Sequence, residues 1–343
     1  MCALFYRSLR AIKLLFRLPA SPCVSYTRAC DLRRIVRLPA ALLASRKRGT
    51  VAEKATLALV AASTAYQVWE MSRYTRFRPV QSLPAESLDT NRHVGLLIAN
   101  VLQTNRNVGE YIQLIRASSP DLVVLAETDH YWEQSLREVE LDYPHTIKCP
   151  LENTYGLLLY SRLPLIEPKI LFRVEKDVPS FSVQVKLRTG DIFQLHVVHP
   201  RPPHLGVDTV GRDAELILVA KEVKDTTLPV IITGDLNDVA WSHTTRLFLR
   251  MSSMLDPRLG RAFCNTFHAH LPFFRWPLDH LFHSRAFRLL KFERGPKTAS
   301  DHFPVIGKLS YEPEIRYEQE RPVPEPQDYA EAERKIEKST AAD

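Results

Sequence analysis

Along residues 92–310, segments with the apolar pattern of a strand alternate with segments whose apolar residues have helical spacing. Runs typical of strands lie at residues 94–99, 121–126, 156–161, 181–187, 192–198, 229–233, 279–283 and 303–309. Apolar residues at helical spacing occur at 107–117, near 130–140, at 211–224 and at 243–254. Strands that alternate with helices in this way predict a layered α/β domain.

The sequences on either side of this region differ from it in composition. Residues 1–54 form a basic segment in which residues 1–50 hold a single acid, Asp31. Such a segment is typical of an organelle transit peptide, of a basic stretch beside a membrane, or of upstream residues outside the working protein. Residues 311–343 are acidic, contain several prolines and have few large aliphatic residues, which predicts a disordered tail.

Residues 55–71 are predicted to form a hydrophobic helix with a possible role at a membrane. The uncharged run, residues 55–69, is shorter than the roughly 20 residues that span a bilayer, but Tyr66 and Trp69 resemble interfacial anchors. We expect membrane association, with the N-terminal arginines in the cytoplasm and the domain on the other side. The alternative is an amphipathic helix packed on a cytoplasmic protein.

The net charge of +7 does not come from the predicted domain. Lysine and arginine outnumber acids by 15 to 5 in residues 1–90, whereas the counts are 26 and 24 in residues 91–310. A nearly neutral domain argues against a nonspecific grip on long polyanions. The five cysteines match neither a zinc site nor a disulfide framework.

Polar residues that could bind a metal ion or move a proton follow one predicted strand after another. Each alone is consistent with a turn or a helix cap, but strands that end at one edge would bring these side chains together. They are Asn100, Glu127, His199, Asp235 with Asn237, Asp279, and Asp301 with His302.

The chemistry of this set points to phosphoester hydrolysis. Carboxylate and amide oxygens without a thiolate are ligands for Mg²⁺ or Mn²⁺, which accompany phosphoryl transfer. A serine hydrolase fits poorly, because the adjacent residues Ser300, Asp301 and His302 cannot face one another as a relay.

The order of these residues resembles the endonuclease/exonuclease/phosphatase superfamily, and most of all its YafD-like branch. The resemblance covers residues 92–310 and includes "PDLVVLAET", "YGLLLYSRLPL", "HPRPP", "GDLND", "DHLFHS" and "SDHFPV". It implies a four-layer α/β sandwich like that of DNase I, with two mixed sheets between helices and the site at one edge. It further implies a metal-dependent hydrolase that acts as a monomer.

The resemblance also implies a role for each residue. Glu127 and Asn100 would hold the metal ion, with Asp301 as a further ligand. Asp235 would deprotonate the attacking water, Asn237 would hold the water or the phosphate, and His302 would donate to a phosphate oxygen. Asp279 would orient a histidine and Tyr155 would contact the phosphate, while His199 matches a catalytic histidine of the nuclease-like branches.

Three functions fit these residues. The first is a nuclease-like phosphodiesterase that acts on nucleic acid. The second applies the same chemistry to a phospholipid or another small phosphoester, and the third is an inactive scaffold. The run "FFRWP", residues 273–277, would stack a base, contact acyl chains or pack in the core.

Overall fold

The computed structural model describes residues 50–203 and 209–340 of the 343-residue chain, so most of the basic segment predicted for residues 1–54 lies outside the described residues. The chain separates into two units, Met1–Thr64 and Ala65–Asp343. The first described element is helix α3 (Val51–Ser72), which includes the predicted hydrophobic helix. Within the described ranges, no helix is both long enough and apolar enough to cross a membrane.

The larger unit contains two mixed β-sheets. The first has six strands in the order β10-β11-β1-β2-β4-β3. Their bounds are β1 His93–Asn100, β2 Leu122–Ala126, β3 His145–Cys149, β4 Leu157–Ser161, β10 Phe287–Arg294 and β11 Val305–Tyr311. Within it β1 and β2 are parallel, and the other neighbouring pairs are antiparallel.

The second sheet has five strands in the order β5-β6-β7-β8-β9. Their bounds are β5 Leu165–Leu171, β6 Ser180–Lys186, β7 Ile192–Val197, β8 Val230–Asp235 and β9 Asp279–His283. Here β7 and β8 are the parallel pair, because α6 (Val210–Asp225) connects them.

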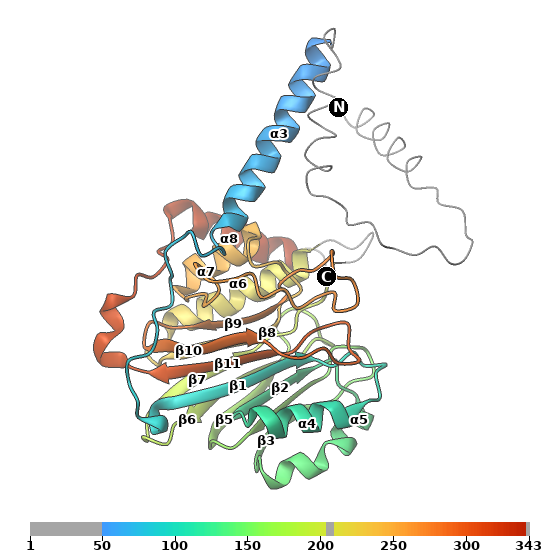
Figure 1. Ribbon diagram of the computed structural model, residues 1–343, viewed down its shortest axis with the longest axis vertical. Helices are drawn as coiled ribbons and strands as arrows, with labels where there is room; N and C mark the ends of the chain where they lie inside the picture. Colours follow the sequence, from blue (N-terminus) through green and yellow to red (C-terminus); the bar gives the residue numbers. More distant parts are fainter. Residues whose placement is uncertain (1–49, 204–208, 341–343) are drawn as a thin grey trace, which may run out of the picture. The chain divides into compact units, whose positions relative to one another are not determined.

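The two sheets face each other between two layers of helices, as Figure 1 shows. Val124, Phe181 and Leu195 belong to the apolar core between the sheets. A second core lies between one sheet and the helices α6, α7 (His243–Ser252) and α8 (Pro326–Thr340), and a third lies between the other sheet and α4 (Val108–Ser118) with α5 (His130–Ser135). Short 3₁₀ turns, Thr90–Arg92, Arg137–Leu141 and Pro313–Glu318, complete the elements. The predicted four-layer α/β sandwich is therefore confirmed.

The C-terminal region corrects one prediction. Residues 311–340 are ordered rather than disordered: Tyr311 ends β11, and α8 packs on the domain. Ala332 and Ile336, spaced four residues apart, contact the core beside α6 and α7. Asp328 forms two 2.7 Å hydrogen bonds with Arg250. The composition of the tail alone could not predict this order, because the residues that α8 contacts lie elsewhere in the chain.

Helix α6 carries a buried acid, Glu215, whose pKa is raised to about 8 by burial, although the charge of Arg173 opposes the shift. The folded state therefore holds a proton that the unfolded chain releases near pH 4.5, and stability falls as the pH rises from about 4.5 to about 8. We expect Glu215→Gln to remove this loss. Urea unfolding at pH 5 and pH 8 should show a smaller drop for the variant than for the wild type; equal drops would contradict the assignment.

Candidate active site

Strand ends from both sheets meet at one edge of the sandwich. Asn100 is the last residue of β1, and its neighbour in register on the parallel strand β2 is Ala126, directly before Glu127. On the other sheet, Asp235 at the end of β8 pairs with Asp279 at the start of β9. Three acids and one amide thus lie together, although the first and last of them, Asn100 and Asp279, are 179 residues apart in the sequence.

The amide of Asn100 links the two sheets. Its Nδ2 donates to Glu127 Oε1 at 2.7 Å and to Asp235 Oδ2 at 3.0 Å, while its Oδ1 accepts from the backbone N–H of Leu102 at 3.0 Å. Burial raises the pKa of Glu127, and the nearby charge of Asp235 raises it further. Burial also raises the pKa of Asp235, with a contribution from Asp279, against the opposing charge of His302.

The backbone around Asp235 places its carboxylate with precision. Gly234 has a φ of +137°, and a Cβ there would lie 2.0 Å from the backbone oxygen of Val198, so the sheet admits only glycine. Asn237 adopts a left-handed conformation with φ 50°, and its N–H donates to Asp235 Oδ1 at 2.9 Å. Glu127 has φ 60°, which is uncommon for a residue other than glycine.

His302 and Asp279 form a buried pair. His302 Nδ1 lies 2.8 Å from Asp279 Oδ2, and the other ring nitrogen, Nε2, lies 3.6 Å from Asp235 Oδ2. Burial lowers the pKa of His302, but Asp279 and Asp235 overcome this effect and raise it to about 10. The imidazole is therefore charged at neutral pH. The hydroxyl of Ser300 donates to the backbone oxygen of Asn100 at 2.8 Å and accepts from the N–H of His302 at 3.0 Å.

His199 and Tyr155 lie beside each other at the same edge. Their ring centroids are 5.9 Å apart, and the Arg201 guanidinium lies 5.4 Å from the Tyr155 ring. Burial lowers the pKa of His199, which keeps this imidazole neutral, and its Nδ1 has no hydrogen-bond partner among the described residues. Burial raises the pKa of Tyr155, which stays a phenol and a hydrogen-bond donor.

Asp301 is not brought into this cluster. Its backbone oxygen accepts from the N–H of Ala269 at 2.6 Å, and its carboxylate forms no hydrogen bond or ion pair with any described residue. Its charge contributes to the raised pKa of His302. The geometry therefore gives no support to Asp301 as a metal ligand next to Glu127.

The residues present fit a hard divalent cation. Glu127 and Asp235 are carboxylates whose pKa values burial raises, and one neutral amide bridges them. A cation would offset the cost of two neighbouring negative charges in the interior. Ligand atoms of Asp235, Asp279 and His302 also lie within 4.8 Å of one another, but a charged His302 cannot coordinate a metal. Glu127 and Asn100 are therefore the better ligands.

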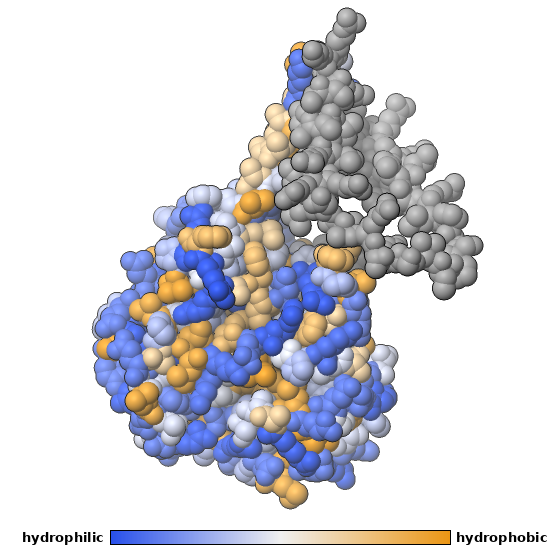
Figure 2. Space-filling view, in the orientation of Figure 1, coloured by the Kyte–Doolittle hydropathy of each residue, from blue (hydrophilic) through white to orange (hydrophobic). Residues whose placement is uncertain are grey.

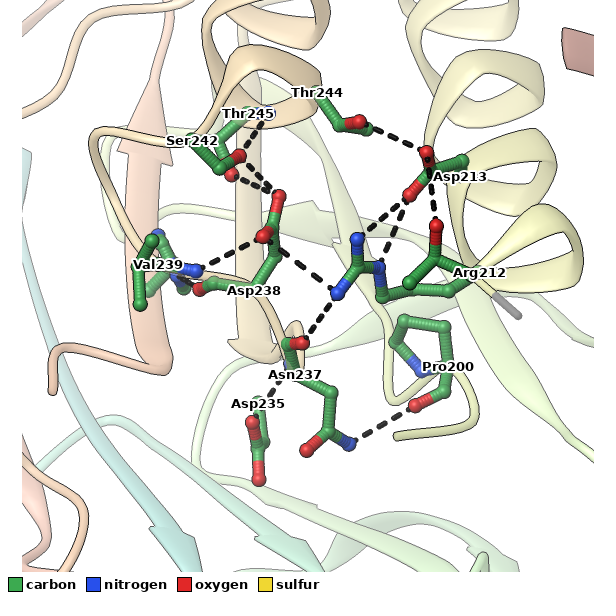
Figure 3. A network of polar contacts seen from close by, with 12 residues as sticks. Pro200, Arg212, Asp213, Asp235, Asn237, Asp238, Val239, Ser242, Thr244 and Thr245 are labelled. Atoms are coloured by element: carbon green, nitrogen blue, oxygen red, sulfur yellow. Dashed lines mark hydrogen bonds and ion pairs between the residues drawn. The ribbon is translucent and has the colours of Figure 1, made fainter. Parts of the chain in front are cut away.

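A second buried network supports the loop that follows Asp235 (Figure 3). The Arg212 guanidinium lies between two carboxylates: its Nη2 donates to Asp213 Oδ1 at 2.8 Å, and its Nη1 lies 3.6 Å from Asp238 Oδ1. The same Nη1 donates to the backbone oxygen of Asn237 at 2.8 Å, and the Asn237 side chain donates to Pro200 O at 3.0 Å. Arg212 thereby holds the left-handed residue whose N–H orients Asp235.

We expect Arg212→Lys to reduce kcat by roughly tenfold to a hundredfold with a small change in KM. Lysine keeps the charge but cannot bond two carboxylates and a carbonyl in a planar fork, so the Asp235 loop loses its support. Steady-state kinetics with Arg116→Lys, an exposed arginine on α4, gives the matched control. A variant with normal kcat would show that the network does not position Asp235.

Two of these contributors, Ser300 and Arg212, were missed from the sequence as functional residues. Ser300 stands next to the predicted Asp301 and His302, so the motif already contained it, but its bond to Asn100 spans 200 residues. Arg212 lies in α6 and acts through a backbone oxygen 25 residues away, which leaves no local sequence signal.

Comparison with known proteins agrees with this geometry. Curated relatives include a UPF0294 protein of Vibrio cholerae, 29% identical over 134 residues, a match that covers 38% of this chain and 46% of the relative. The chain thus spans less than half the length of that relative. The match is consistent with the YafD-like branch.

Solved structures with the same fold share little sequence with this chain. Danio rerio TDP2, in complex with a single-stranded DNA product, is 16% identical with a TM-score of 0.55 and covers 64% of this chain and 99% of its own. The human Nocturnin catalytic domain with bound sulfate is 16% identical with a TM-score of 0.53 and covers 69% and 98%. Residues 97–302, more than half of the chain, match the family described as Endonuclease/Exonuclease/phosphatase. The chain therefore belongs to the endonuclease/exonuclease/phosphatase family.

Proposed function

We propose that this protein is a Mg²⁺- or Mn²⁺-dependent phosphodiesterase that hydrolyses a phosphoester by attack of an activated water. The observation that carries the proposal is the facing pair of Asp235 and His302: a buried carboxylate of raised pKa lies 3.6 Å from a charged imidazole. One group can accept a proton and the other can stabilise negative charge.

Each side chain has a distinct task in this mechanism. Asp235 takes a proton from water, and the water oxygen forms a bond to phosphorus while the bond from phosphorus to the leaving oxygen breaks. His302 donates to a phosphate oxygen as negative charge develops, and Asp279 keeps the imidazole charged and oriented. His199 and Tyr155 supply neutral donors at the same edge.

Glu127 and Asn100 would hold the metal ion. When bound, the ion would polarise a phosphate oxygen and neutralise charge on the phosphate. With Glu127 engaged in this way, Asp235 remains available for the water.

Two substrate classes are compatible with this chemistry. Nucleic acid is supported by the likeness to TDP2, which was solved with single-stranded DNA. A phospholipid or another small phosphoester is supported by the near balance of charge in residues 91–310, which offers little attraction to a long polyanion. An inactive scaffold is disfavoured, because acids, amides and histidines remain assembled at one edge.

The chemistry can be tested without knowing the natural substrate. We expect the purified chain to hydrolyse the soluble diester bis(p-nitrophenyl) phosphate, to lose this activity on treatment with a chelator, and to regain it with Mg²⁺ or Mn²⁺. Nitrophenolate release measures the reaction. Activity that persists after complete chelation, or no turnover with either metal, would contradict the proposal.

A further inference from the structure

A loop rich in aromatic residues projects into solvent beside the active site. Within residues 269–276, termed the aromatic loop, Leu271 is 46% exposed, Phe273 83%, Phe274 60% and Trp276 38%. Single apolar side chains are common on protein surfaces, but four large ones exposed within six positions form a contiguous apolar patch. Such a patch indicates a contact with a partner. Figure 2 shows hydrophobic and hydrophilic residues intermixed over the face in view.

The base of the aromatic loop is fixed to the catalytic histidine. The N–H of Phe267 donates to the backbone oxygen of Trp276 at 2.9 Å, and the Phe267 ring lies 4.9 Å from the ring of His302. The N–H of Ala269 also donates to the backbone oxygen of Asp301. A partner that contacts the aromatic loop therefore lies next to the site of phosphoester chemistry.

A cavity of about 600 Å³ borders the aromatic loop and combines apolar rings with cations. Phe273 and Phe292 line it together with four arginines. Its one lining acid, Glu293, is paired with Lys291 at 2.7 Å. Among the described residues, Arg258 is paired with Asp256, whereas the other three cavity arginines form no ion pair. The arginines are Arg258, Arg261, Arg275 and Arg294.

Several buried polar atoms in the cavity lining have no partner. Arg258 is fully buried; its Nε and Nη2 bond to Asp256 at 2.8 and 2.9 Å, but its Nη1 has no partner among the described residues. The same is true of Arg275 Nε and Asn265 Oδ1. A buried guanidinium N–H without a partner is costly, so an acceptor that reaches Arg258 or Arg275 from the cavity would offset that cost.

A second group of aromatic and basic residues adjoins the same cavity. The Tyr74 ring stacks on Phe263, a cavity residue, with centroids 6.0 Å apart. Next to Tyr74, Phe77 is 95% exposed and lies among Arg73, Arg76 and Arg78. Exposed rings interleaved with arginines are typical of proteins that lie at the interface of an anionic membrane.

We propose that the aromatic loop and its cavity dock on an anionic phospholipid membrane, with the rings in the interface and a lipid phosphate held by the cavity arginines. The loop includes an aliphatic residue, Leu271, which suits acyl chains better than stacked bases. The cations form a compact group that matches single headgroups rather than a long track for a polyanion. Docking would present a neighbouring phospholipid to His302; that substrate assignment rests on the proposed function, whereas docking itself does not.

The first test compares binding and hydrolysis with full-length protein. We expect Phe273→Ser combined with Phe274→Ser to lower flotation with vesicles of phosphatidylcholine and phosphatidylglycerol by about tenfold or more, since two rings lose their apolar contact. Turnover of bis(p-nitrophenyl) phosphate should stay within about twofold, and hydrolysis of vesicle phospholipid should fall with binding. Leu88→Ser combined with Leu141→Ser, two exposed leucines elsewhere, is the matched control. Failure of the wild type on the soluble diester would refute the proposed function and leave the docking test intact.

A second test reports on the loop itself, because residues 1–64 could hold the chain at a vesicle. We expect brominated phosphatidylcholine in the same vesicles to quench tryptophan fluorescence, and Trp276→Phe to remove much of that quenching, whereas Trp132→Phe, a buried control, does not. Quenching that does not depend on Trp276 would overturn the proposal. Loss of single-stranded DNA binding by the serine variant, without quenching of Trp276, would equally overturn it and make this surface a nucleic-acid contact.

Discussion

Asp235→Asn is expected to lower kcat/KM for a soluble phosphodiester by roughly 10³-fold, because the amide cannot accept a proton from the attacking water. One of the two hydrogen bonds to this carboxylate can persist, since the amide oxygen can still accept from Asn100 Nδ2 or from the N–H of Asn237. Burial raises the pKa of the Asp235 carboxyl above its unfolded value, so the ionised carboxylate costs stability at neutral pH. The variant should therefore be inactive and at least as stable as the wild type.

Urea unfolding and steady-state kinetics on one preparation check both parts of this prediction. Asp225→Asn, an exposed acid at the end of α6, is the matched control and should change neither quantity. A variant of Asp235 that retains near-normal turnover would refute its assignment as the base. A variant that unfolds at much lower urea would instead show that the carboxylate is structural.

Much of the site was predictable, because its residues follow strongly apolar strands. Asn100, Glu127 and Asp235 each come at the end of a buried run, and such runs are visible in the sequence. The arrangement of the sheets then brings these ends together without any further local signal. The predicted strands that carry the site are confirmed.

The strands missed from the sequence share a physical cause. β3, β5 and β10 are edge strands, with a neighbour on one side only, and much of their length is exposed or half-buried. Edge strands need fewer apolar residues, and charged residues on them discourage pairing with other chains. Their sequences, such as "LIEPKIL" and "FRLLKFER", therefore lack the pattern of a buried strand.

The other features that the sequence did not predict depend on contacts between residues far apart in the chain. Lys335 of α8 donates to Asp213 at 2.7 Å, which joins the C-terminal helix to the Arg212 network and through it to Asn237. The sequence alone marks neither Lys335 nor Arg212 as part of this network, because a lysine in an acidic tail and an arginine on a helix are usually solvated. The sequence did not decide whether Phe273 and Phe274 pack in the core or form a binding surface. Both side chains are exposed in the structure, which excludes the core.

Asp279→Asn is expected to reduce kcat/KM by roughly 10²-fold to 10³-fold, and His302→Ala by at least as much. Asp279 reaches the reaction only through His302: its Oδ2 contacts the imidazole at 2.8 Å and supplies the largest of the charges that raise the pKa of His302. The asparagine amide can still accept from Nδ1, but it lacks the charge that favours the imidazolium.

The decisive comparison is the double variant. If Asp279 acts through His302, then Asp279→Asn combined with His302→Ala should be no worse than His302→Ala alone, within about threefold, because groups that act as a unit do not add. Kinetics of the two single variants, the double variant and His130→Ala, an exposed histidine on α5, provide the measurement and its control. Losses that multiply would mean that Asp279 contacts water, metal or substrate directly, and its free oxygen Oδ1, which has no partner among the described residues, would be the atom responsible.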